Sequence, residues 1–184
     1  MRVNECTILM LPGRGNSPPG HWQSRWEARM TRARRVEQHD WERPVRAPWV
    51  ASIAQAIAHG PRPVVLVAHS LGCVAALWAL RQLEPDAAAG LFLVAPPSEH
   101  RIHALAEIDN AFAPVPREKL PCPAVLVASR NDPAADFAWS EALAASLGAQ
   151  FTDAGEAGHV DEEAGFGPWP EGLMRLGQLL RGLG

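Results

Sequence analysis

Short uninterrupted apolar runs alternate along the chain with longer segments in which apolar residues recur at helical spacing. The apolar runs predict strands near residues 7–11, 34–38, 63–69, 90–95, 123–129 and 149–153. The longer segments predict helices near residues 21–33, 48–59, 71–84, 135–147 and 169–181. Because alternating strands and helices build a parallel sheet covered on both faces, we expect a three-layer α/β fold.

The most informative junction lies at residues 64–72, VVLVAHSLG, where a predicted central strand leads directly into a predicted helix. Ser70 stands at this junction and Gly72 follows it closely. A serine on a sharp strand-to-helix turn with small neighbours is typical of the nucleophile elbow of α/β-hydrolases. Ala68 occupies the position where the usual motif has glycine, a difference of one methyl group. Ser70 is therefore the candidate nucleophile, although a serine beside a glycine is also an ordinary helix N-cap.

A candidate acid and a candidate base follow the serine along the chain. Asp132 comes just after the predicted strand at 123–129, and open α/β sheets build their sites at the carboxyl ends of strands. His159 lies on a loop after the last predicted strand, and imidazole has a pKa suited to activating a serine hydroxyl. A carboxylate fixes the tautomer of such a histidine and stabilises its imidazolium. The chain order Ser70, Asp132, His159 is that of α/β-hydrolases.

Alternatives exist for both the acid and the base. Asp132 precedes a proline, a pattern that is also typical of a turn or a helix cap. Three further acids compete with it: Asp136, Asp153 and Asp161. The first is predicted inside a helix, the second at the end of a strand, and the third too near His159 to reach behind its ring. His69 adjoins the serine, but on a strand it points to the opposite face, so we expect a packed or hydrogen-bonded role for it.

A Gly-rich loop, PGRGN at residues 12–16, follows the first predicted strand. An oxyanion hole in this fold combines a backbone N–H from such a loop with that of the residue after the nucleophile. We therefore assign the oxyanion hole to the N–H groups of Arg14 and Leu71, although a tight turn with positive φ at glycine explains the same loop. The GxxxxGK[ST] pattern of a phosphate loop is absent. Candidate pocket residues are Gly13, His21 and Trp22.

The segment from Pro96 to Pro121, where larger hydrolases of this fold insert a lid, is short. Polar residues and prolines interrupt it, so we expect a minimal lid in which a loop and a short helix cover the pocket. A deep, lipase-like acyl tunnel is therefore not expected. Trp22, Trp26 and Trp41 could wall the pocket, but core packing accounts more readily for each of them.

Length and composition are those of an ordinary globular protein. The chain has 184 residues, of which 47% are hydrophobic and 20% charged, and we expect one domain over residues 1–184. A formal net charge of −3 gives no broad basic field, which argues against a nucleic-acid partner. A local basic cluster is expected on the solvated face of a helix end; it comprises Arg29, Arg32, Arg34 and Arg35.

Cysteine usage and hydropathy bear on compartment and cofactors. Cys6, Cys73 and Cys122 are odd in number, lie among apolar residues and lack metal-site spacing, which favours reduced thiols. No apolar stretch reaches the roughly 18 residues of a membrane span, and the amino terminus is too short and too charged for a signal peptide. We therefore expect a cytoplasmic protein with no metal, cofactor or membrane partner, and leave a protein partner open.

Motifs spread nearly from end to end resemble those of a known family. They are LPGRGNSPPGHWQSRWE, VEQHDW, VVLVAHSLG, LVAPP, SRNDP and AGHVDEEAGFGPWPEG. They resemble the small serine hydrolases that include retinoblastoma-binding protein 9 and its bacterial relatives, and the last motif is especially similar to the bacterial branch. The resemblance implies a compact α/β-hydrolase fold with a Ser-Asp-His triad at Ser70, Asp132 and His159.

These observations together predict an esterase-type serine hydrolase that acts on small acyl substrates through an acyl-enzyme on Ser70. In this interpretation His159 is the general base and acid, and Asp132 orients it. The alternative is a non-catalytic binding protein that keeps the fold and the triad. The presence of all three residue types in the right order favours the enzyme. Preference among esters, thioesters and amides stays open.

Overall fold

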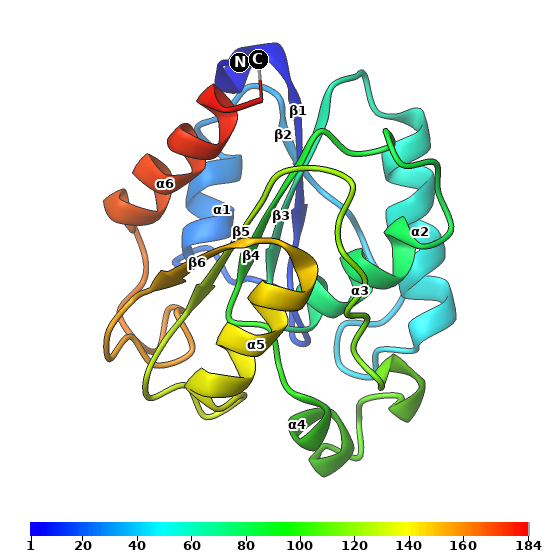
Figure 1. Ribbon diagram of the computed structural model, residues 1–184, viewed down its shortest axis with the longest axis vertical. Helices are drawn as coiled ribbons and strands as arrows, with labels where there is room; N and C mark the ends of the chain where they lie inside the picture. Colours follow the sequence, from blue (N-terminus) through cyan, green and yellow to red (C-terminus); the bar gives the residue numbers. More distant parts are fainter. Residues whose placement is uncertain (184) are drawn as a thin grey trace.

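The computed structural model describes residues 1–183 and contains a six-stranded sheet with helices on both faces (Figure 1). The strands are β1 (Thr7–Leu11), β2 (Ala33–Arg35), β3 (Val64–His69), β4 (Gly90–Val94), β5 (Ala124–Ala128) and β6 (Gln150–Asp153). They lie in the order β2-β1-β3-β4-β5-β6, and every neighbouring pair is parallel. The predicted α/β architecture is confirmed.

Six α-helices and two short 3-10 helices complete the described chain. They are η1 (Val3–Glu5), α1 (Trp22–Glu27), α2 (Arg46–His59), α3 (Leu71–Leu80), α4 (Glu99–Ala104), η2 (Asn110–Phe112), α5 (Phe137–Leu147) and α6 (Pro170–Arg181). Helices α1 and α6 cover one face of the sheet, and α2, α3 and α5 cover the other (Figure 1). Within residues 1–183, none of these helices has the length and apolar character needed to cross a bilayer.

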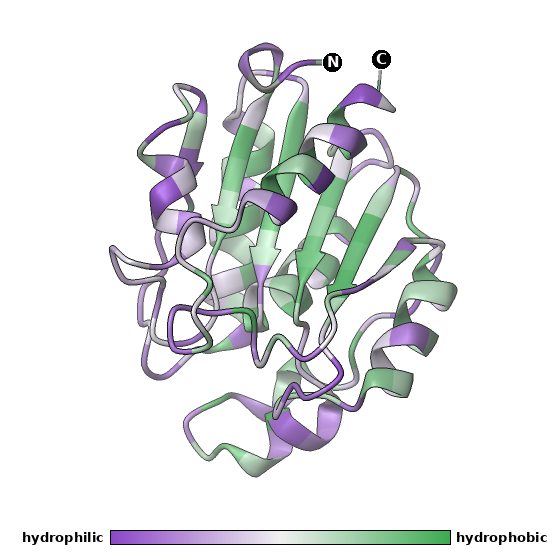
Figure 2. Ribbon diagram, turned by 90° about the vertical axis from the view of Figure 1, so that its left-hand side faces the viewer, coloured by the Kyte–Doolittle hydropathy of each residue, from purple (hydrophilic) through white to green (hydrophobic). Residues whose placement is uncertain are grey.

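The central strands are apolar except at Thr7, which begins β1, and His69, which ends β3, and both of their faces are buried (Figure 2). Side chains that point toward α2, α3 and α5 are Leu9, Leu11, Leu66, Ala68, Leu91, Leu93, Leu126 and Ala128. Side chains that point toward α1 and α6 are Ile8, Met10, Val65, Val67, Phe92, Val94, Val125 and Val127. Because side chains on both faces are buried, the sequence shows continuous apolar runs. The same packing holds the strands in place, including the ends from which the loops emerge.

The first helix and the second strand differ most from the prediction. Helix α1 ends at Glu27, not near residue 33, and β2 has only three residues. The chain turns at Met30, whose carbonyl accepts the N–H of Ala33, and β2 then pairs with the edge of β1. The basic cluster is therefore not a helix end. Arg35 lies on β2 with a side chain only 13% exposed, and its guanidinium pairs with Glu27 at 3.0 Å.

The sheet has its topological switch point between β1 and β3. From β1 the chain first runs outward to β2, whereas β3 lies on the other side of β1 and the later strands follow it in order. Loops after two such neighbouring strands diverge, and ligands of open α/β sheets bind in the crevice between them. The Gly-rich loop and Ser70 leave the sheet at this point.

Candidate active site

Ser70 occupies a strained turn between β3 and α3. Its φ of 53° and ψ of −129° are values that L-residues rarely adopt. Its N–H donates to the carbonyl of Val94 at 2.9 Å, which ties the turn to the neighbouring strand. A side chain at Gly72 would overlap the carbonyl oxygens of Leu11 and Pro12, so only glycine lets α3 start this close to β1. The alanine at position 68 is accommodated within β3.

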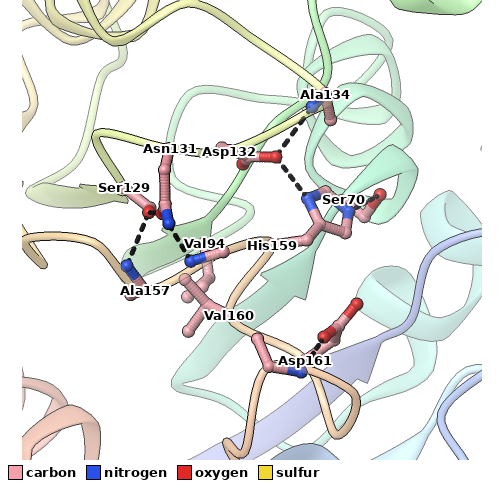
Figure 3. Close-up of polar contacts among 12 residues, drawn as sticks. Ser70, Val94, Ser129, Asn131, Asp132, Ala134, Ala157, His159, Val160 and Asp161 are labelled. Atoms are coloured by element: carbon pink, nitrogen blue, oxygen red, sulfur yellow. Dashed lines mark hydrogen bonds and ion pairs between the residues drawn. The ribbon is translucent and has the colours of Figure 1, made fainter.

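The structure brings Ser70, His159 and Asp132 together in one hydrogen-bonded chain (Figure 3). His159 Nε2 lies 2.9 Å from Ser70 Oγ, and His159 Nδ1 lies 2.9 Å from Asp132 Oδ1. The Asp132 side chain is only 4% exposed and that of His159 is 20% exposed. Asp132 Oδ1 also accepts the N–H of Ala134 at 2.8 Å. The turn that the Asp-Pro pair suggested therefore coexists with the contact to histidine.

The three competing acids lie elsewhere. Asp136 is exposed at the N-cap of α5, not inside the helix as the sequence suggested. Asp153 forms an ion pair with Arg130 at 2.6 Å, and Asp161 Oδ1 accepts the N–H of Ala164. None of these three carboxylates bonds to a histidine within residues 1–183. Asp132 is the acid that the fold places behind the His159 ring.

The two N–H groups assigned to the oxyanion hole flank the serine. Arg14 follows Gly13, and a Cβ built on Gly13 would lie 2.7 Å from the Cβ of Ser70, so the loop approaches the nucleophile closely. Leu71 is the first residue of α3. In the part of the chain that the structure describes, neither the N–H of Arg14 nor that of Leu71 donates to an acceptor. Neither donor is used by the described residues, and the assignment of both to the oxyanion hole stays a prediction.

A cavity of about 250 Å³ opens at the nucleophile. Four parts of the chain line it: residues Gly13, Arg14, Asn16 and Pro18 in and after the Gly-rich loop, His21, the end of β3 with His69 and Ser70, and His159 with residues 161–163. Gly13 and His21 therefore line it as expected. Residues 96–121 do not contribute to the wall, so the prediction that this segment covers the pocket is wrong. Helix α4 instead lies beyond the carboxyl ends of the strands (Figure 1), and the acidic segment 161–163 borders the cavity.

Comparison with known proteins agrees with this geometry. A family model described as serine hydrolase matches residues 8–178. The chain belongs to the serine hydrolase family. A YdeN-like hydrolase from Pectobacterium atrosepticum is 34% identical over 98% of this chain and 94% of its own, with a TM-score of 0.86. The predicted family and hydrolase class are confirmed, which favours the enzyme over the binding protein.

More distant solved structures share the fold. The ydeN gene product from B. subtilis is 22% identical, with a TM-score of 0.78 over 96% of this chain and 99% of its own. Thermogutta terrifontis esterase 2 is 15% identical, with a TM-score of 0.71 over 97% of this chain and 84% of its own. Among curated proteins no sequence matches significantly.

The tryptophans of this hydrolase do not wall its cavity. Trp22, a predicted pocket residue, is fully buried, and its ring lies 4.6 Å from that of Trp26 and 5.1 Å from that of Trp169. Its Nε1–H donates to the carbonyl of Val160 at 2.9 Å. Trp41 packs against Trp49 on the other side of the sheet. The prediction for Trp22 is wrong because burying both faces of its ring stabilises the fold more than exposing the ring beside a polar serine would.

Polar side chains that the sequence did not single out hold the loops of this hydrolase. The Ser129 hydroxyl donates to Asn131 Oδ1 at 2.8 Å and accepts the N–H of Ala157 at 2.9 Å, while Asn131 Oδ1 accepts the N–H of Gly158 at 2.7 Å (Figure 3). These bonds link the loop that carries the acid to the loop that carries the base. Both residues belong to the SRNDP motif. Their position directly after a predicted strand was the feature of the sequence that could have indicated a role at the site.

Two further side chains that the sequence analysis did not assign to the site, those of Gln23 and Arg35, hold the Gly-rich loop. Gln23 is fully buried, and its Nε2 donates to the carbonyls of Leu11 at 3.3 Å and Val67 at 3.1 Å. The Arg35 guanidinium donates to Asn16 Oδ1 at 2.6 Å. Buried amides and guanidinium groups need such partners, and here they hold the backbone of Leu11 and the side chain of Asn16, which lie on either side of Arg14 in the chain.

Two further histidines lie beside His159 and are neutral. His21 Nδ1 accepts the N–H of Gln23 at 3.1 Å, and burial lowers the pKa of His21 to about 4. Burial also holds the pKa of His69 well below its usual value. His69 is hydrogen-bonded, as predicted, since its Nε2 lies 2.9 Å from the carbonyl oxygen of His159. His159 is the one histidine that contacts Ser70 Oγ within residues 1–183.

Proposed function

We propose that this serine hydrolase is an esterase that transfers a small acyl group to Ser70 Oγ and then to water. The observation that carries the proposal is the unbroken hydrogen-bonded chain from Ser70 Oγ through His159 to Asp132 Oδ1. A serine hydroxyl is a poor nucleophile at its ordinary pKa, and a histidine in direct contact removes its proton during attack. The carboxylate at Nδ1 keeps the Nε2 lone pair directed at the serine.

Acylation begins when Ser70 Oγ attacks the substrate carbonyl carbon while its proton moves to His159 Nε2. The carbonyl π electrons move to oxygen, and the N–H groups of Arg14 and Leu71 are the assigned donors to that oxyanion. The tetrahedral intermediate collapses, the ester C–O bond breaks, and the leaving alkoxide takes the proton from His159. The products of this half-reaction are the alcohol and an acyl ester on Ser70.

Deacylation repeats the same steps with water as nucleophile. His159 accepts a proton from water as it attacks the acyl carbon, then returns a proton to Ser70 Oγ as the carboxylic acid leaves. Asp132 stabilises the imidazolium in both halves of the reaction. The cycle consumes one ester and one water and regenerates the hydroxyl of Ser70.

The preference for small acyl groups rests on the size of the cavity. Its volume of about 250 Å³ lies below the range of roughly 300–1,000 Å³ that is typical of pockets for drug-sized ligands. Six of the residues that line it are three histidines, at positions 21, 69 and 159, and three carboxylates, at positions 161–163. Such a site holds the reacting ester group and only a short acyl chain.

The experiment that tests the proposal is covalent labelling with a fluorophosphonate, followed by mass spectrometry of the labelled peptide. We expect one label on Ser70, because the probe captures only a serine that a base activates. Ser70→Ala is the control: it should fold normally, take up no label and lose ester hydrolysis by several orders of magnitude, since triad members act as a unit. A folded wild-type protein without label, or near wild-type turnover in Ser70→Ala, contradicts the proposal.

A further inference from the structure

The loop that carries His159 is held by ring N–H groups at two successive carbonyls. The carbonyl oxygen of His159 lies 2.9 Å from Nε2 of His69, and the carbonyl of Val160 accepts Nε1–H of Trp22 at 2.9 Å. Val160 itself has a φ of 51°, so the backbone turns sharply at this position. The two donors come from β3 and α1, elements that belong to the rigid core.

The bond from His69 fixes its tautomer. A backbone carbonyl can only accept, so Nε2 of His69 must carry the proton. His69 is 6% exposed, and the titratable groups that face it are His159 and His21, whose ring centroids each lie 4.9 Å from that of His69. Both of these neighbours disfavour a positive charge on His69. The ring is therefore a neutral donor at the pH at which a serine hydrolase works.

His69 also closes a ring of contacts around the nucleophile and its base. It is the residue before Ser70 in the chain, and it binds the main chain of His159. His159 Nε2 in turn bonds to Ser70 Oγ at 2.9 Å. This short cycle through His69 links the nucleophile to its base, in addition to the bonds that hold the rest of the loop. A misplacement of catalytic groups by about 1 Å can cost roughly 100-fold in rate.

We propose that His69 is a positioning residue that holds His159 at hydrogen-bond distance from Ser70 by donating its Nε2–H to the His159 carbonyl. This inference rests on the proposed function, because His69 can position the catalytic base only if His159 is that base. His69 lines the cavity beside Ser70, but no hydrogen bond joins its ring to Ser70 Oγ within residues 1–183. Its Nε2–H is committed to the His159 carbonyl, so we assign it to orienting the base.

Two substitutions separate the hydrogen bond from ring packing. His69→Phe keeps a ring of similar size but has no donor, so the His159 carbonyl loses its partner. We expect kcat to fall at least about tenfold with KM within about twofold, because positioning acts on the transition state. His69→Gln carries an amide N–H near the position of Nε2, and we expect it to recover most of the kcat that the phenylalanine variant loses.

The split between kcat and KM is a readout that simple destabilisation does not move, because a loss of folded protein does not change the kcat of the molecules that remain folded. Trp26→Phe is the matched control: it removes a buried ring donor to the carbonyl of Pro168 in the same aromatic cluster. It should lower the melting temperature without changing kcat or KM.

Other outcomes overturn the inference. If His69→Phe keeps the wild-type kcat, His69 has no positioning role. If His69→Gln or Trp26→Phe loses as much kcat as His69→Phe does, the loss comes from altered packing or stability. If the phenylalanine variant does not fold, the ¹⁵N chemical shifts of the wild-type histidines test the inference instead. A neutral His69 ring with its proton on Nδ1 could not donate Nε2–H to the His159 carbonyl, and this result would overturn the inference. Wild-type labelling at Ser70 distinguishes these failures from failure of the proposed function itself.

Discussion

At the scale of single residues, the candidate site depends on which side-chain atoms already take part in hydrogen bonds. Asp132 Oδ1 accepts two N–H groups, one from the backbone of Ala134 and one from His159, so a single oxygen both shapes its turn and orients the base. The turn and the triad explanations of the Asp-Pro pair are thus compatible. A carboxylate fixed by the backbone is preorganised for its partner, which lowers the cost of stabilising the imidazolium.

Asparagine at position 132 tests this assignment of the acid. Asp132→Asn should keep the fold yet lower kcat by a factor on the order of 10⁴, because the amide can present a donor to Nδ1 and leave the histidine in the wrong tautomer. Asp136→Asn is the control, since Asp136 is exposed and makes no side-chain cap bond in α5. It should change kcat little. Exchange of these two phenotypes in steady-state ester hydrolysis would show that Asp136 is the acid.

The buried histidine at the start of α1 predicts how stability varies with pH. The pKa of His21 is about 4 in the folded protein, below the ordinary histidine value of about 6.5, so the unfolded chain binds more protons between these values. The free energy of unfolding should therefore fall as the pH drops from about 6.5 to 4, with a contribution from His21 of about 3 kcal/mol.

Asn at position 21 isolates that contribution. His21→Asn retains an oxygen that can accept the N–H of Gln23 as an N-cap, but it has no titrating ring. Urea unfolding at pH 7 and at pH 4.5 should show a smaller loss of stability in this variant than in the wild type. An equal loss in both proteins would assign the acid sensitivity to other groups.

At the scale of elements, the elbow depends on how closely α3 approaches β1. Gly72 lies against the carbonyls at the end of β1, and Gly13 lies against Ser70 from the loop that follows. Both contacts join the two strands that border the switch point. The elements therefore bring the Gly-rich loop to the nucleophile by direct backbone packing.

Alanine at position 72 should disrupt this junction. Gly72→Ala places a methyl group on the carbonyls of Leu11 and Pro12, so we expect a loss of about 3 kcal/mol in unfolding free energy and a large loss of kcat. Gly177→Ala in α6 is the matched control, because only the flexible end of Arg181 lies near its added methyl, at 3.7 Å. Alanine there should stabilise the helix by up to about 1 kcal/mol. Wild-type stability in Gly72→Ala would contradict the packing at the elbow.

The sequence predicts elements well where local pattern and burial coincide. The strand around residues 64–69 is apolar on both faces, and the turn at Ser70 needs small residues, so local chemistry specifies both. Helix α1 was predicted too long because pairing of β2 with β1, a tertiary contact, ends the helical segment. Trp22 was misplaced for the same reason: its partners, such as Trp169, lie far away in sequence. Local pattern carries no information on such contacts.

At the scale of the whole molecule, the site lies at the carboxyl edge of the sheet and its wall comes from loops distant in sequence. The loop after β1 and the segment after β6 meet over Ser70, while residues 96–121 stand apart from the cavity. Three consecutive carboxyl side chains, at residues 161–163, border the opening. The cavity at the nucleophile thus has a volume of about 250 Å³, and within residues 1–183 its lining includes three histidines and three carboxylates.

This architecture predicts how kcat/KM depends on acyl length. Each further CH₂ of an acyl chain is worth about 0.8 kcal/mol, or about fourfold in kcat/KM, but only while an apolar wall exists to bury it. A cavity of about 250 Å³ provides that wall for a few carbons only. With p-nitrophenyl esters of graded length, kcat/KM should rise over the shortest chains and then level or fall beyond medium length. A steady rise out to long-chain esters, measured below micelle formation, would require a covered apolar channel that the loops around Ser70 do not form.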